Sequence, residues 1–170
     1  MRALVVVGLL GVLALVFVVT AIVRDSQGKA GTAAGCPEGW PLADLTLHEP
    51  KDVKINVLNA TDEVGRAGSV ADDFRNRKFQ VQKVGNAPKE DKVALLVYGP
   101  KAVGSAHLLQ AYFLNNAKPV YDGKRTDDVV DVVLGNNFQQ LATTTEVNQS
   151  LGDSGPVEAP PQSCPSPPAK

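Results

Sequence analysis

The chain has 170 residues, of which 17 are basic and 18 acidic, so its formal net charge is −1. This balance excludes the strongly basic class of nucleic-acid-binding proteins. Aromatic residues make up only 5% of the chain, so an aliphatic core is expected. The composition divides the chain into an apolar start (1–24), a linker rich in Gly and Pro (25–50), a candidate domain (51–151) and a Pro-rich, disordered tail (152–170). The remaining stretch of about 100 residues is enough for one compact domain.

The apolar start predicts a transmembrane anchor. The 21 residues from Ala3 to Val23 carry no charged side chain. At 1.5 Å rise per residue, a helix of this length spans roughly 30 Å, the thickness of the hydrocarbon layer. The run is longer than the apolar part of a cleaved signal peptide, although small residues at 29–34 leave cleavage open. Because little more than Arg2 precedes the run, we expect the N-terminus in the cytoplasm and the domain outside the cell membrane.

The two cysteines lie on either side of the candidate domain. The chain has an even number of cysteines, and the expected compartment is oxidising. Cys36 and Cys164 therefore suggest a disulfide. Two free thiols are the first alternative. A lipid-modified Cys36 is the second, since small residues precede it, but it lies 13 residues beyond Val23.

The candidate domain alternates strand and helix patterns in chain order. Apolar residues predict strands at 53–58, 79–84, 93–98, 118–121 and 129–134, helices at 64–78 and 102–113, and a short final helix containing Phe138, Leu141 and Val147. The unbroken apolar run at 93–98 is typical of a central strand buried on both faces. Pro119 places 118–121 at a sheet edge, because proline cannot donate to a strand ladder. The order β-α-β-β-α-β-β predicts an α+β two-layer sandwich, in which helices cover one face of a small mixed sheet.

Acidic residues before the last strand are the first candidate for chemistry. If Asp127 and Asp131 share one strand face, they could hold a cation or act as a general acid and base, with Asp128 beside them. A solvated turn is the simpler interpretation. The two histidines and two cysteines are too widely separated to predict a zinc site. The sequence therefore predicts no catalytic residue, no metal site and no cofactor.

The turn between the first strand and the first helix is the second candidate. Free backbone N–H groups near Gly65 could receive an anionic group, and Arg66 would add positive charge. The simpler interpretation is a helix start with a solvated side chain. Asn59 begins a glycosylation sequon, but a short Asn side chain in a turn also binds nearby backbone groups, and this second role is preferred.

Three stretches resemble the LytR C-terminal domain family. The strand and turn at 55–61, followed by the glycines of 65–68, are similar to the opening of that domain. The acidic turn, Val-rich strand and Leu-Gly pair at 127–138 are similar to its later part. The resemblance covers roughly 51–151, and the chain is too short for the separate phosphotransferase domain of full LytR-type enzymes. It is most similar to the stand-alone, membrane-anchored actinobacterial members.

The resemblance implies a non-enzymatic role in cell-envelope integrity. The expected partners are peptidoglycan or an attached glycopolymer, or a LytR-type phosphotransferase. Flanking cysteines such as Cys36 and Cys164 also suit this group. The family supplies no catalytic residue. A carboxylate-dependent envelope hydrolase and a membrane assembly scaffold acting through the transmembrane helix remain as alternatives.

The charge of the external part limits how it can bind a wall polymer. Without Arg2 and Arg24, 15 basic residues face 18 acidic ones. A mildly acidic protein does not adhere broadly to anionic polymers. Any such binding must therefore come from a local site.

Overall fold

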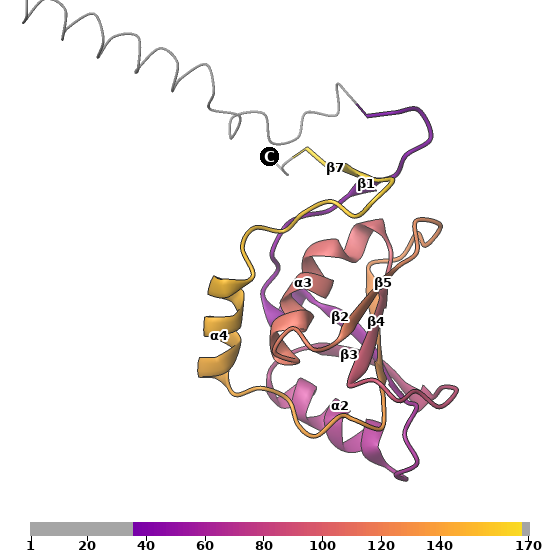
Figure 1. Ribbon diagram of the computed structural model, residues 1–170, viewed down its shortest axis with the longest axis vertical. Coiled ribbons are helices and arrows are strands. Elements are labelled where there is room, and N and C mark those ends of the chain that lie inside the picture. The colour runs from indigo at the N-terminus through magenta and orange to yellow at the C-terminus, as the bar shows by residue number, and fades with distance from the viewer. Residues whose placement is uncertain (1–35, 168–170) are drawn as a thin grey trace, which may run out of the picture. The chain divides into compact units, whose positions relative to one another are not determined.

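The computed structural model describes residues 36–167 (Figure 1). The predicted anchor at 3–23 lies outside the described residues. Among the residues that are described, no helix has the length and apolar character that a membrane crossing requires. The anchor therefore stays a prediction from the sequence.

The described chain follows the expected order of strands and helices, including a final helix, and adds one short strand near each end. Its elements are β1 (Leu42–Ala43), β2 (Lys54–Asn59), α2 (Arg66–Asn76), β3 (Gln80–Asn86), β4 (Ala94–Tyr98), α3 (Val103–Tyr112), β5 (Lys118–Tyr121), β6 (Val129–Leu134), α4 (Thr144–Asp153) and β7 (Cys164–Pro165). Short 3₁₀ turns precede β2 and α3. From β2 to β6 the predicted order β-α-β-β-α-β-β is confirmed.

Five strands form the predicted mixed sheet, in the order β3-β2-β6-β4-β5. β2 pairs in parallel with both β3 and β6, and β4 pairs in parallel with β5. β6 and β4 are antiparallel, so they join the two parallel halves. Parallel neighbours need a crossover connection, which α2 and α3 provide. β5 lies at the sheet edge, as Pro119 predicts.

The core lies between one face of the sheet and the helices. Alternate residues of the central strands are buried there, including Ile55, Val57, Val130 and Val132, each 0% exposed. The few aromatic residues join α2 to α3: the rings of Phe74 and Tyr112 are 6.1 Å apart, and Phe79 packs against both. This contact places α2 and α3 on the same face of the sheet. α4 packs against the outer side of α3 (Figure 1).

The opposite face of the sheet carries no helix within residues 36–167, and we call it the open face. The prediction that strand 93–98 is buried on both faces is therefore wrong. In β4 the residues Ala94, Leu96 and Tyr98 are buried, whereas Leu95 and Val97 on the open face are only half-buried. An unbroken apolar run does not reveal whether its second face is covered by a helix or by side chains alone.

The last helix begins later than the sequence pattern predicts. Thr143 and Glu146 form a capping box: the Thr143 hydroxyl accepts from the Glu146 N–H, and the Glu146 carboxylate accepts from the Thr143 N–H. Phe138 and Leu141, which the sequence pattern places in this helix, are buried in the loop before it. This loop passes beside α2, and it forms part of the candidate site.

The two cysteines join the two ends of the described chain. Cys36 and Cys164, 128 residues apart in sequence, form a disulfide, which confirms the expected pairing. Next to it, β1 and β7 pair in parallel. The Pro content predicts a disordered tail from 152 onward, but Val157 and Ala159 pack against the core. The disulfide and the β1–β7 pair fix this segment, which has too little apolar surface to form a core of its own.

Candidate functional site

The turn between β2 and α2 is held by Asn59. Its side-chain amide donates to the Glu63 carbonyl at 2.8 Å, and its side-chain oxygen accepts from the Thr61 N–H at 3.1 Å. These bonds give Asn59 the backbone-binding role expected of an Asn in a turn. Gly65 follows with a φ of 83°, a left-handed conformation that glycine adopts without strain. The turn thereby fixes where α2 begins.

Arg66, the first residue of α2, points back over the turn and the loop before α4. Its Nη2 lies 2.5 Å from the Glu63 carboxylate, and its guanidinium lies 5.8 Å from the ring centroid of Phe138. Its Nε is buried and has no hydrogen-bond partner among the described residues. Arg66 is therefore held in place while one of its donors remains unused.

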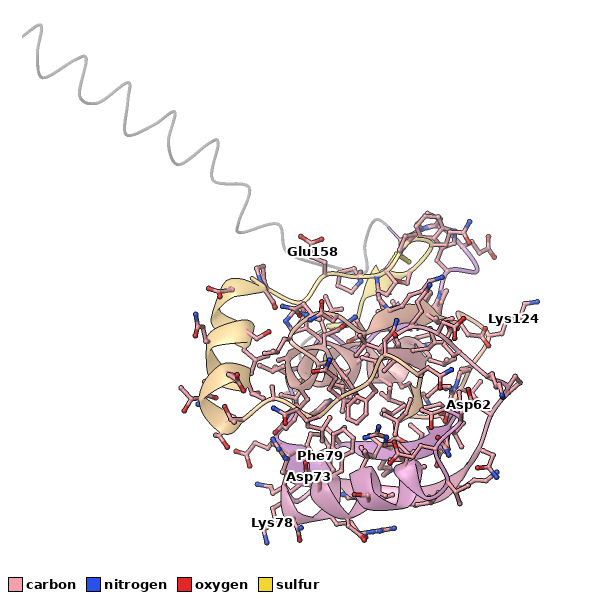
Figure 2. All side chains as sticks on the ribbon, turned by 60° about the horizontal axis from the view of Figure 1, so that its bottom comes forward. Asp62, Asp73, Lys78, Phe79, Lys124 and Glu158 are labelled. Atoms are coloured by element: carbon pink, nitrogen blue, oxygen red, sulfur yellow. A yellow bond between two sulfur atoms is a disulfide. The ribbon has the colours of Figure 1, made fainter. Side chains whose placement is uncertain are left out.

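A groove of about 360 Å³ lies between α2 and residues 138–143, and we call it the α2 groove. α2 lines it with Arg66, Ser69 and Asp73, Arg77 follows directly after the helix, and the loop lines it with Gln139 and Gln140. Spacings of three and four residues put the first four side chains on one side of the helix. Figure 2 shows Asp73 on the side of α2 that faces the rest of the domain.

Arg77 closes the far end of the α2 groove. Its Nε and Nη2 donate to the Asp73 carboxylate at 2.9 and 3.2 Å, and its Nη1 donates to the Ala142 carbonyl at 2.6 Å. The guanidinium also lies 5.5 Å from the ring centroid of Tyr112. These contacts fix the loop against the helix, so the groove has a rigid wall.

The predicted acidic pair lies on the open face, and a residue that the sequence reasoning missed brings it together. Arg125 donates through Nη1 to Asp131 and through Nη2 to Asp127, both at 2.8 Å. The same guanidinium donates to the carbonyls of Val97 and Val129. We call Arg125, Asp127 and Asp131 the Arg125 cluster. A basic residue two positions before Asp127 was the signal that could have revealed it.

The carboxylates of this region are all engaged with donors of the protein. Asp131 also accepts from the Asn56 amide at 2.7 Å, and Asp128 binds the Lys54 ammonium at 2.8 Å. The hydrogen bond from Arg125 lowers the pKa of Asp127, and the hydrogen bond from Lys54 lowers the pKa of Asp128. A catalytic general acid needs the opposite shift. Within the described range, no group of three His, Cys, Asp or Glu residues is placed to hold a metal ion.

The candidate residues therefore fall into two separate regions. Asn59, Gly65 and Arg66 belong to the turn and groove on the helix side of the sheet. Asp131 lies on the open face, because it alternates with the buried Val130 and Val132. Gly65 and Arg66, which the sequence indicates, mark one end of the α2 groove, whereas Arg77, Gln139 and Gln140 carry no comparable signal in the sequence.

The comparisons with known proteins identify the family. The model of the family described as LytR cell envelope-related transcriptional attenuator matches residues 52–138. The chain belongs to this family. The match contains the whole of α2 and extends to Phe138, so most of the α2 groove lies within the family domain. The expected family is thus confirmed.

Two individual proteins are similar to this chain. The cell envelope integrity protein Cei of Mycobacterium tuberculosis is 28% identical over 118 residues, which cover 68% of this chain and 55% of that protein. The chain thus spans about half the length of this relative. The soluble domain of a conserved hypothetical secreted protein from Mycobacterium marinum has a TM-score of 0.55 and 24% identity, covering 71% of this chain and 83% of that one. This second similarity shows the fold.

Proposed function

We propose that this chain is a non-enzymatic, membrane-anchored protein that supports cell-envelope integrity by binding wall polymer outside the cytoplasm. Its family is cell-envelope-related, and a relative carries the name cell envelope integrity protein. The solved structure with the same fold comes from a secreted protein. The observation that carries the proposal is the α2 groove, which has both polar and apolar walls and is closed at one end by the bond from Arg77 to Ala142.

The shape and lining of the α2 groove suit a polymer. It runs along α2 from Arg66 to Arg77, about three turns of helix, and its volume of about 360 Å³ suits a short stretch of a sugar chain. Gln139 and Gln140 are exposed on one side and offer planar amides, which both donate and accept hydrogen bonds. Sugar hydroxyl groups have the same double capacity. The groove therefore offers many weak contacts rather than one reactive group.

The carboxylates support a binding role rather than a hydrolase. A glycosidase needs two carboxyl groups with different pKa values, one of them raised. Here Asp127 and Asp131 bind the same guanidinium, and the pKa of Asp127 is lowered. Their geometry favours a structural role in holding the loop before β6.

Sedimentation with purified wall material tests the proposal. The full chain is mixed with peptidoglycan, with or without its attached glycopolymer, and then centrifuged. We expect the wild-type chain in the pellet, and we expect the Arg66→Ala variant to bind at least about fivefold less. The matched control is Arg75→Ala, because Arg75 lies on the same helix, is half-exposed and pairs with Asp72 outside the groove.

Three outcomes of the sedimentation test decide whether the chain binds wall polymer. Retention of the wild-type chain with a clear loss in the Arg66 variant supports the proposal. A wild-type chain that stays in the supernatant overturns it. A chain that stays in the supernatant but is captured by an immobilised LytR-type phosphotransferase would replace polymer binding with an enzyme partner.

Membrane anchoring is tested separately. We expect the full chain in the membrane fraction after a carbonate wash, and we expect a chain lacking residues 1–24 to be released. Protease added to intact spheroplasts should digest the domain. A domain that is protected in intact spheroplasts would contradict the proposed location.

A further inference from the structure

The charges of the α2 groove cancel one another. Arg66 pairs with Glu63, and Arg77 pairs with Asp73. These two ion pairs leave the groove with cations at both ends but without excess positive charge. A site for phosphate groups needs donors whose charge is not already neutralised.

The donors of Arg77, which a phosphate would use, are also occupied. Three nitrogens of Arg77 donate to acceptors of the protein, so this side chain has little left for a ligand. At the start of α2, a negative charge would be favoured by the helix dipole. Glu63, which lies three residues before Arg66 and binds it, already places a carboxylate at that end. The anion predicted for the Gly65–Arg66 turn is thus supplied by the chain itself.

Apart from Arg66, whose charge Glu63 neutralises, the groups that remain available are uncharged or apolar. Ser69, Gln139 and Gln140 are exposed and present a hydroxyl and two amides. Val70 and Leu141 supply apolar surface at the base of the groove. Hydroxyl and amide groups match sugar hydroxyls and an acetamido group, and the apolar base matches its methyl group and the C–H faces of the rings.

We propose that the α2 groove selects an uncharged, N-acetylated glycan strand and rejects phosphate-bearing polymers. This inference rests on the proposed wall-binding function and names the ligand class of the same groove. The mildly acidic external part of the chain acts in the same direction, because 15 basic residues against 18 acidic ones repel a polyanion at long range.

Competition between defined probes tests the ligand class. The full chain bound to wall material is challenged with a neutral N-acetylglucosamine tetramer, with a glucose tetramer of the same linkage, and with inorganic polyphosphate. We expect the N-acetylated tetramer to displace the chain and the glucose tetramer to be at least about tenfold weaker. Polyphosphate should have no effect. Between 50 and 300 mM salt, binding of the N-acetylated tetramer should change less than about twofold, because screening acts on charges.

Side-chain variants test whether the glycan binds in the α2 groove. The double variant Gln139→Ala/Gln140→Ala should bind the N-acetylated tetramer at least about tenfold more weakly, and it should fold, because both side chains are exposed. Gln82→Ala is the matched control, since Gln82 is an exposed glutamine on β3, away from the groove. Equal binding by the double variant and the control would overturn the assignment to the groove.

The outcomes separate this inference from the function on which it rests. If the chain sediments with wall material but only polyphosphate displaces it, the ligand class is wrong and the wall-binding function stands. If the chain sediments but neither tetramer competes, the neutral-glycan inference is also overturned. If the chain does not sediment at all, both proposals fail.

Discussion

Two arginines on opposite faces of the sheet use their hydrogen-bonding capacity differently. The Arg125 side chain is 16% exposed and donates to two carboxylates and two backbone carbonyls. The Arg66 side chain is 28% exposed, forms one ion pair and keeps a buried Nε without a partner among the described residues. A side chain that is fully bonded within the protein stabilises the fold. A fixed side chain that is only partly bonded within the protein and borders a groove is suited to hold a ligand.

The surroundings of the two arginines extend this difference. Arg125 connects the loop before β6 to the backbones of β4 and β6, so its bonds belong to the sheet itself. Arg66 connects a turn to the loop at 138–143, both of which border a groove. The comparison predicts that changes at Arg125 mainly reduce stability, whereas changes at Arg66 mainly reduce binding.

The largest expected effect is a loss of stability from a change that leaves the surroundings of both arginines intact. Replacing both Cys36 and Cys164 with Ser should lower the free energy of unfolding by about 4–5 kcal/mol, because a loop spanning 128 residues is no longer closed in the unfolded chain. Chemical denaturation measures this change. Since the effect acts through the unfolded state, groove affinity measured under folding conditions should remain within about twofold. A large loss of affinity in the folded variant would show that the disulfide shapes the groove.

The second largest expected effect is the stability loss from removing the cation of the Arg125 cluster. Arg125→Ala should cost about 3 kcal/mol of stability, because it leaves the half-buried Asp131 without its cation and frees two carbonyls. Denaturant unfolding of the variant, compared with Arg75→Ala, measures the difference. A loss below about 1 kcal/mol would contradict the structural role of the cluster.

Arg66 should show the reverse pattern. Its exposed ion pair with Glu63 and its position over Phe138 together predict a stability loss of about 1 kcal/mol for Arg66→Ala. Binding to wall material should nevertheless fall at least about fivefold. The same preparation serves for both measurements, which are unfolding by denaturant and sedimentation with the wall. A stability loss as large as that of Arg125→Ala would remove the contrast between the two arginines.

The smallest expected effect is a response to acid. The pKa of Asp127 is lowered in the folded chain by its hydrogen bond from Arg125. A lowered pKa contributes stability that is present above the unfolded value of about 3.9 and is lost as the pH falls through the folded value. The wild-type chain should therefore lose part of its advantage over Asp127→Asn between pH 6 and pH 3, as measured by denaturant unfolding at each pH. Because Asp127 is half-exposed, the change should be small, and an advantage that grows in acid would contradict the assignment.

The fold could be predicted from the sequence where local patterns decide it. The strand at 53–58 follows from alternating β-branched residues, the strand at 129–134 follows from its run of valines, and Pro119 places its strand at the edge. Segments fixed by distant partners were assigned less well. The residues around Val157 contain too little apolar surface to predict a place in the fold, and their position depends on the disulfide and on β1.

The sequence predicts only the part of the candidate site at the start of α2. Gly65 and Arg66 stand out because a helix start is visible in the sequence. Gln139 and Gln140 reach the groove because the loop crosses α2, and the bond from Arg77 to Ala142 joins residues 65 positions apart. No local pattern reveals such a contact. For the acidic pair the sequence left a bound cation open as an alternative to a solvated turn, and the structure pairs both carboxylates with Arg125, two residues before Asp127.

The most direct test of the central claim is amide hydrogen exchange of the full chain with and without the N-acetylglucosamine tetramer. We expect increased protection in α2 and in the loop at 138–143, with exchange around Arg125 and Asp131 unchanged. Protection that appears on the open face instead, or no change in either region, would contradict the assignment of binding to the α2 groove.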